Sequence, residues 1–170
     1  TIHPFLDGNG RVGRLLITLY LVSKGILKQP ILYLSDFFEK NRALYYDNLT
    51  RVRTHNDLNQ WLKFFLTGVI ETAKKGVIAF DGILQLQKNL DLKIKSLGNR
   101  SVDAQKVITY LYTQPVIDAN KVVELIQKSN VTAYKLLADF EKLDILKEIS
   151  GAHRNKLYVF NEYINLFKDE

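Results

Sequence analysis

Apolar residues recur every three to four positions along most of the chain, and this period predicts a mainly α protein. The predicted helices cover residues 10–24, 36–53, 57–97, 101–114, 118–130 and 131–144. Ser35 and Asp118 are predicted N-caps, and Gly25 is a predicted stop for the first helix.

The long helical pattern at 57–97 contains three glycines, at positions 68, 76 and 82. An interior glycine costs a helix about 1 kcal/mol relative to alanine. The glycines therefore predict either two or three separate helices or one helix that bends.

The period changes near the C-terminus, where apolar and polar residues alternate over 145–150 and 156–161. These segments flank "GAHRN" at 151–155 and predict a β-hairpin with its turn there. Two helices, a turn, a third helix and a hairpin form the winged version of a helix-turn-helix. With "LGNRS" at 97–101 as the boundary, the sequence predicts a helical portion over 1–97 and a small α+β winged-helix domain over 98–170.

Length and composition limit the function classes. The chain has 170 residues, enough for one typical domain or two small ones. No run of about eighteen apolar residues is present, and no basic segment followed by an apolar one stands at the start of the sequence, so we expect neither a membrane span nor a signal peptide. The absence of cysteine fits a reducing compartment, and we expect a cytoplasmic protein. Because the sequence starts at Thr1 and contains no methionine, we expect a fragment of a longer protein.

Charge is divided unevenly between the two halves. Residues 1–100 carry a net charge of +7, and residues 101–170 carry −1, which gives +6 for the chain. A nucleic-acid partner is therefore disfavoured for the second half, where His153, Arg154 and Lys156 form only a small basic cluster.

The run "HPFLDGNGRVGR" at 3–14 concentrates chemistry at the start of the first predicted helix. Gly8 and Gly10 let the backbone turn with its N–H groups pointing into one concavity, where the helix dipole adds partial positive charge. Arg11 and Arg14 lie three residues apart on the helix and supply cationic donors suited to phosphate. Together these residues predict a phosphate-binding loop.

Two further side chains complete this constellation. Asp7 is a hard oxygen ligand of the kind that Mg²⁺ uses together with phosphates and water. His3 belongs to the residue type that most often serves as a general base near neutral pH. Each feature alone is more often a turn, a solvated charge or a structural histidine, and the functional interpretation depends on their combination.

The run resembles the signature H-x-F-x-[D/E]-G-N-G-R-x-x-R of the Fic family at every specified position. The matching residues are His3, Phe5, Asp7, Gly8, Asn9, Gly10, Arg11 and Arg14. The segments "NRALYYDNL" at 41–49 and "WLKFFLTGV" at 61–69 resemble the helices that follow the motif in Fic proteins. An appended winged helix is common in one branch of that family.

The resemblance implies a protein adenylyltransferase that moves AMP from ATP to a serine, threonine or tyrosine hydroxyl of a target protein. His3 would take the proton of the attacking hydroxyl, and Asp7 would hold the Mg²⁺ that bridges the phosphates. The family's target-docking helices and flap precede the motif, so we expect little transferase activity from these 170 residues alone.

The resemblance also implies roles for the other motif residues. Asn9 and the backbone of Gly8 to Gly10 would form an anion hole, Arg11 and Arg14 would bind the β and γ phosphates, and Phe5 would pack into the core. Tyr45 or Tyr46 would border the adenine, although tyrosines at helical spacing are more often packing residues.

Alternatives remain open for both halves. Related proteins transfer phosphate, UMP or phosphocholine, and the presence of Gly10 favours AMP. The winged helix is either a DNA-binding regulator or a module for internal packing, homodimer formation or protein docking. Its net charge favours the second group.

Overall fold

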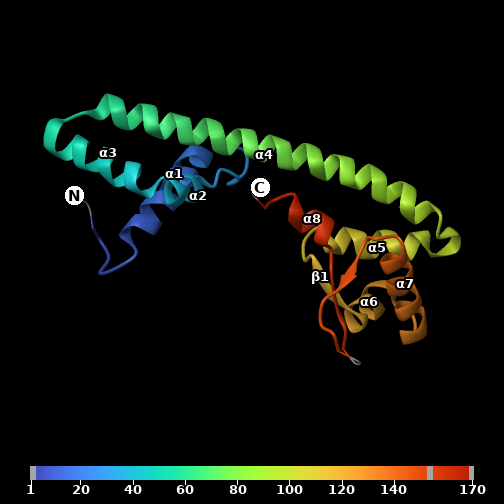
Figure 1. The fold of residues 1–170 in the computed structure, drawn as a ribbon. Coiled ribbons are helices and arrows are strands. Elements are labelled where there is room, and N and C mark those ends of the chain that lie inside the picture. The colour runs from blue at the N-terminus through green and yellow to red at the C-terminus, as the bar shows by residue number, and fades with distance from the viewer. Residues whose placement is uncertain (1–2, 153–154, 169–170) are drawn as a thin grey trace. The chain divides into compact units, whose positions relative to one another are not determined.

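A computed structural model describes residues 3–152 and 155–168 (Figure 1). It confirms a mainly α fold with one small antiparallel sheet. The helices are α1 (Asn9–Ser23), α2 (Leu34–Lys40), α3 (Arg42–His55), α4 (Leu58–Lys95), the 3₁₀ turn η1 (Gly98–Arg100), α5 (Ser101–Leu111), α6 (Ala119–Ile126), α7 (Asn130–Lys142) and α8 (Asn161–Asn165). The strands are β1 (Val116–Asp118), β2 (Lys147–Glu148) and β3 (Leu157–Val159).

Contacts within the chain define an N-terminal unit, Thr1–Ile78, and a C-terminal unit, Ala79–Glu170. Each unit has its own hydrophobic cluster of buried side chains. The division falls inside α4, so this one helix contributes residues to both units. The predicted domains, 1–97 and 98–170, stay a prediction.

The core of the N-terminal unit is small and rich in aromatic side chains. Its buried members are Leu32, Leu34, Phe37 and Phe38. Half-buried residues of α1, α3 and α4 pack around them, and Trp61 stacks near Phe38 with 6.5 Å between ring centroids. The buried Thr18 hydroxyl donates to the Leu32 carbonyl at 2.9 Å and so ties α1 to the segment before α2.

The single helix predicted over 36–53 is wrong, because the structure breaks it at Asn41. There the backbone leaves helical geometry (φ −108°, ψ 35°). Both the backbone N–H and the side-chain Nδ2 of Asn41 donate to the Phe37 carbonyl, each at 3.0 Å. An asparagine side chain that competes for a helical carbonyl in this way favours a helix end. The predicted Ser35 cap is also wrong, since α2 begins at Leu34 with no side-chain cap.

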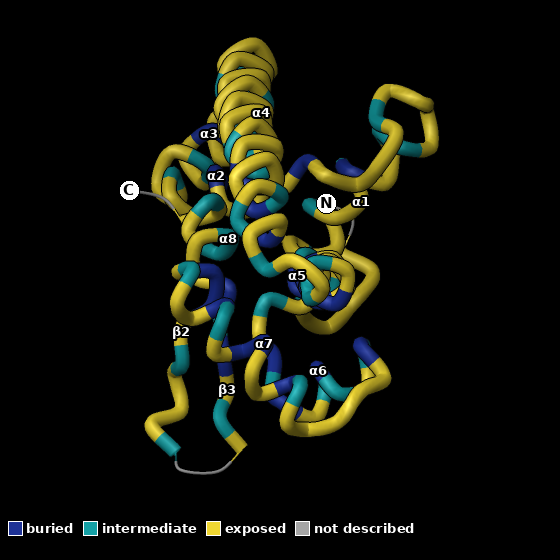
Figure 2. Tube along the Cα trace, turned by 90° about the vertical axis from the view of Figure 1, so that its right-hand side faces the viewer, coloured by how far each residue is buried: buried dark blue, intermediate teal, exposed yellow. Residues whose placement is uncertain are grey.

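The pattern over 57–97 forms one helix, α4, rather than two or three. Two of its glycines provide room for neighbours instead of ending the helix. A Cβ atom at Gly68 would lie 2.5 Å from Phe37 Cδ1, and one at Gly82 would lie 2.8 Å from Leu166 Cδ2. In the tube coloured by burial, α4 is exposed over much of its length (Figure 2). No described helix, α4 included, is long and apolar enough to cross a membrane.

The C-terminal unit surrounds a larger core, in which Phe140 and Phe160 are completely buried. The predicted Asp118 cap is confirmed, since its carboxylate accepts from the Lys121 N–H at 2.8 Å. Ser129 caps α7 in the same way through the Thr132 N–H. Between α6 and α7 the chain turns sharply at Gln127, which adopts left-handed φ of 54°.

Three short strands complete the C-terminal unit in the order β1-β3-β2, and both pairings are antiparallel. The predicted hairpin is confirmed as β2 paired with β3, with Lys147 opposite Val159. Strand β1 and helix α8 were not expected, because three and five residues are too few for a periodic pattern.

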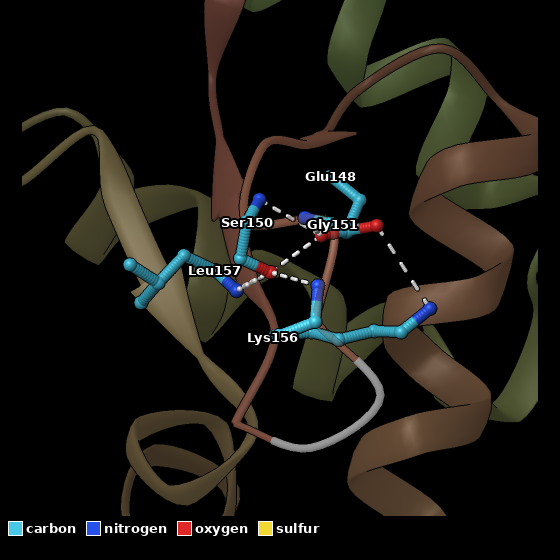
Figure 3. Close-up of polar contacts among 6 residues, drawn as sticks. Glu148, Ser150, Gly151, Lys156 and Leu157 are labelled. Carbon is cyan, nitrogen blue, oxygen red and sulfur yellow. Dashed lines mark hydrogen bonds and ion pairs between the residues drawn. The ribbon is translucent and has the colours of Figure 1, made fainter.

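A carboxylate organises the turn after β2 (Figure 3). Glu148 Oε1 accepts from the Ser150 and Gly151 N–H groups at 2.8 Å and also from the Ser150 hydroxyl. The Ser150 hydroxyl oxygen accepts from the Leu157 N–H at 3.2 Å, which links the turn back to β3. His153 and Arg154, predicted for the basic cluster, lie outside the described residues.

Candidate active site

The motif residues lie in the loop that leads into α1 and in the first turns of that helix. Gly8 is the N-cap of α1 and adopts φ +79°, the left-handed region that favours glycine. Within residues 3–152 and 155–168, no side chain caps this end of α1. The first N–H groups of a helix have no partner within the helix and carry partial positive charge, so this N-terminus can accept an anion.

Both motif arginines fold back toward this N-terminus. A Cβ atom added at Gly8 would lie 3.4 Å from Arg11 Nη2, and one added at Gly10 would lie 3.4 Å from Arg14 Nη1. Among the described residues, the buried Nε of Arg14 has no hydrogen-bond acceptor. The glycines thus leave space for two guanidinium groups beside the helix N-terminus, an arrangement that concentrates positive charge where phosphate oxygens would bind.

Asp7 lies on the solvent side of the loop and forms an ion pair with Arg11, with 3.2 Å between Oδ2 and Nη2. Both side chains are well exposed, Asp7 at 93% and Arg11 at 75%, so the pair is weak in water. The described residues contain no group of three or more histidine, cysteine or acidic side chains that could hold a metal. A single carboxylate nevertheless fits Mg²⁺, which takes one or two protein carboxylates and completes its ligands with phosphates and water.

His3 and Phe5 are both exposed in the loop before α1. The expectation that Phe5 packs into the core is wrong, since its side chain is 52% exposed. The aromatic core of the N-terminal unit begins further along the chain, with Ile17 of α1, and does not include Phe5. His3 therefore lies beside Phe5 on an open segment that solvent and a substrate can both reach.

Asn9 has contacts that the sequence did not indicate. Its Oδ1 accepts from the Phe5 N–H at 3.0 Å, and its Nδ2 donates to the Phe5 carbonyl at 2.7 Å. The amide therefore binds both main-chain polar groups of one residue four positions earlier. The predicted anion-hole role of Asn9 stays a prediction.

The two tyrosines of α3 differ in their surroundings. Tyr45 packs on the aromatic core, 4.9 Å from Phe38 and 5.8 Å from Trp61 between ring centroids. Tyr46 is 55% exposed, and the Arg42 guanidinium lies 5.9 Å from its ring centroid. Of the two, Tyr46 has the ring face that a ligand could still reach, and a role beside adenine stays a prediction for both.

Comparison with known proteins connects this loop to a family. The sequence profile described as "Fic/DOC family" matches residues 1–21, which include the whole motif and most of α1. The similarity to the Fic/DOC family is therefore concentrated at the start of the chain.

A curated relative extends the similarity beyond the motif. The chain is 25% identical over 127 residues to a protein of Aquifex aeolicus (strain VF5) named "Probable protein adenylyltransferase aq_aa38". The aligned region is 64% of this chain and 38% of the relative. The chain therefore spans well under half of that relative.

Proposed function

We propose that this chain belongs to a Fic-type adenylyltransferase that moves AMP from ATP to a hydroxyl side chain of a target protein. The observation that carries the proposal is the uncapped N-terminus of α1 with the guanidinium groups of Arg11 and Arg14 folded beside it. The match of residues 1–21 to the Fic/DOC profile and the name of the Aquifex relative support the same reaction class.

His3 acts as the general base in this proposal. It accepts the proton of the target hydroxyl as the hydroxyl oxygen forms a bond to the α-phosphorus of ATP. The bond from that phosphorus to the oxygen leading to the β-phosphate breaks, and pyrophosphate leaves. Exposure of His3 in the loop leaves the room that a protein substrate needs.

The phosphates bind where the positive charge is concentrated. Arg11 and Arg14 neutralise the β and γ phosphates, and the N–H groups at the start of α1 receive the remaining oxygens. Asp7 would hold Mg²⁺, which supplies charge neutralisation on the phosphates when bound. Arg11 would exchange its ion pair with Asp7 for a phosphate, at little cost because that pair is exposed.

Labelling with ATP tests the proposal. The full-length protein is incubated with Mg²⁺, a cell lysate and ATP labelled on the α-phosphate, and we expect label on protein bands. His3→Ala and Arg14→Ala should each lower labelling by about 10²-fold or more, since base and charge stabilisation each contribute on that scale. Arg53→Ala, an exposed arginine in the last turn of α3, is the matched control and should label normally.

A second label identifies the transferred group. ATP labelled on the γ-phosphate should leave protein unlabelled, because that phosphate departs with pyrophosphate. Label from the γ-phosphate but not from the α-phosphate would replace AMP transfer with phosphate transfer. Label that persists in His3→Ala would refute the assigned base.

The C-terminal unit suggests a second candidate function, a winged-helix module. The observation in favour is the order of elements along the chain. Helix α6 is followed by the sharp turn at Gln127, by α7 with its Ser129 cap and then by the β2–β3 hairpin. We propose that this module docks protein rather than DNA, because the acidic Asp139 and Glu141 lie among the lysines of α7. Binding to duplex DNA at two salt concentrations tests it, and affinity that falls steeply with salt would favour DNA.

A further inference from the structure

We propose that Asn9 is a positioning residue whose amide clamps the loop carrying Asp7 to the first turn of α1. The inference rests on the adenylyltransferase function proposed above, and it gives this residue of the motif a task besides the predicted anion hole. It is carried by the pair of hydrogen bonds between the Asn9 side chain and the main chain of Phe5.

The clamp closes the loop at its base. Phe5 N–H to Asn9 Oδ1 measures 3.0 Å and Asn9 Nδ2 to the Phe5 carbonyl measures 2.7 Å, so donor and acceptor of one residue are both satisfied by one side chain. Leu6, Asp7 and Gly8 are the only residues between the two partners. Their conformation is therefore restricted even though Leu6 is fully exposed and Asp7 forms only an exposed ion pair with Arg11.

Asparagine suits this task better than its closest alternatives. Its terminal group offers one acceptor and an NH₂ donor at a fixed spacing, which matches the main-chain acceptor and donor of Phe5. Aspartate would keep the bond from the Phe5 N–H but would place a second oxygen against the Phe5 carbonyl. Alanine would lose both bonds.

The clamp affects the distance between His3 and the phosphate site at the N-terminus of α1. Asn9 belongs to α1, so the clamp holds Phe5, and with it the neighbouring His3 segment, at a fixed place relative to the helix N-terminus. A base and a phosphate site that must act on one hydroxyl need such restraint, because small misplacements reduce the rate strongly. Loss of the clamp should therefore lower kcat more than it raises KM for ATP.

Two measurements test the inference, and the first needs no enzyme activity. Amide hydrogen exchange of Phe5 is followed by NMR in the nucleotide-free chain of 170 residues. We expect exchange about tenfold faster in Asn9→Ala than in the wild type and intermediate in Asn9→Asp, because each net hydrogen bond contributes about 1 kcal/mol. Asn59→Ala, which removes an exposed asparagine of α4, is the matched control and should leave Phe5 exchange unchanged.

The second measurement is steady-state labelling by the full-length protein. We expect Asn9→Ala to lower kcat at least tenfold with KM for ATP changed less than twofold, and Asn9→Asp to fall between it and the wild type. Unchanged Phe5 exchange in Asn9→Ala, or a raised KM with normal kcat, would overturn the inference. If Phe5 exchange rises in Asn9→Ala as expected but neither the wild type nor any variant transfers AMP, the proposed function is refuted and the restraint of the loop by Asn9 is still supported.

Discussion

Replacement of Gly68 by alanine should destabilise the N-terminal unit, although alanine is the better helix former. A Cβ atom there would lie 2.5 Å and 2.6 Å from Cδ1 and Cε1 of Phe37, well inside van der Waals contact. Phe37 is buried against Phe38 and Phe64 and has little room to move. Overpacking of this kind costs about 1–3 kcal/mol.

Gly76→Ala is the matched control, because it lies in the same helix and the same unit with nothing within 4 Å of an added Cβ. Both substitutions gain about 1 kcal/mol from helix propensity. The propensity gain cancels when the two variants are compared, so their free energies of unfolding should differ by about the overpacking cost, 1–3 kcal/mol.

Urea unfolding followed by tryptophan fluorescence measures this difference. Trp61 is the only tryptophan of the chain and lies in the aromatic core beside Phe38 and Phe64, so its signal reports on the N-terminal unit. We expect Gly76→Ala to unfold at a higher urea midpoint than the wild type. We expect Gly68→Ala to unfold at a lower midpoint than Gly76→Ala. Equal midpoints for the two variants would refute the close-packing explanation, and Phe37→Leu should recover part of the Gly68→Ala loss if that explanation is right.

Three further predictions concern the C-terminal unit. Phe140→Ala should lower its free energy of unfolding by about 3–5 kcal/mol, measured by thermal unfolding, because Phe140 is completely buried. Lys128→Ala should cost about 1–3 kcal/mol in urea unfolding, since it leaves the buried Asp103 carboxylate without its 2.6 Å partner, and Asp103→Asn combined with it should recover stability. Hydrogen bonds, chiefly from the Ser150 hydroxyl, hold the pKa of Glu148 below its ordinary value of 4.5. The stabilisation of the turn by Glu148 is therefore present above pH 4.5 and lost as the pH falls through the lower pKa of the folded state. Amide exchange in the turn should accelerate over that fall in pH in the wild type, and the Glu148→Gln variant should show no such acceleration.

Helix positions were predictable to the extent that burial follows a helical period. The segments at 101–114, 118–130 and 131–144 fold as α5, α6 and α7, each with apolar residues turned to one core. The break between α2 and α3 was not predictable from periodicity, because a side-chain hydrogen bond of Asn41 ends the helix without interrupting the apolar pattern.

The role of glycine in the helix α4 could not be predicted fully, for a related reason. Sequence shows the cost of glycine inside a helix but not the neighbour that requires its small size. Gly68 is buried beneath Phe37, thirty-one positions earlier, and only the folded chain brings these two residues together. An interior glycine near several phenylalanines is the signal that could have indicated close packing instead of a helix end.

The motif loop was recognisable from sequence because its specified residues fall within twelve consecutive positions. Its internal contacts were not recognisable. The hydrogen bonds from Asn9 to the main chain of Phe5 and the position of the Arg11 guanidinium beside Gly8 depend on backbone angles. Residue types alone do not give these angles. The exposure of Phe5 was missed because an aromatic residue in an otherwise polar motif resembles a core residue in sequence alone.

The continuity of α4 has a consequence for how the chain loses its structure. Its side chains enter one core through Phe64 and Phe65 and the other through Leu86 and Leu90, while every residue from 73 to 78 is exposed. This stretch contributes to neither core, although its Lys75 forms an exposed ion pair with Asp36 of α2 at 3.7 Å. Exposed ion pairs add little stability, and the backbone hydrogen bonds of a helix without packing are marginal. The helix should therefore melt first at its centre, so that either end can remain ordered after the other has unfolded.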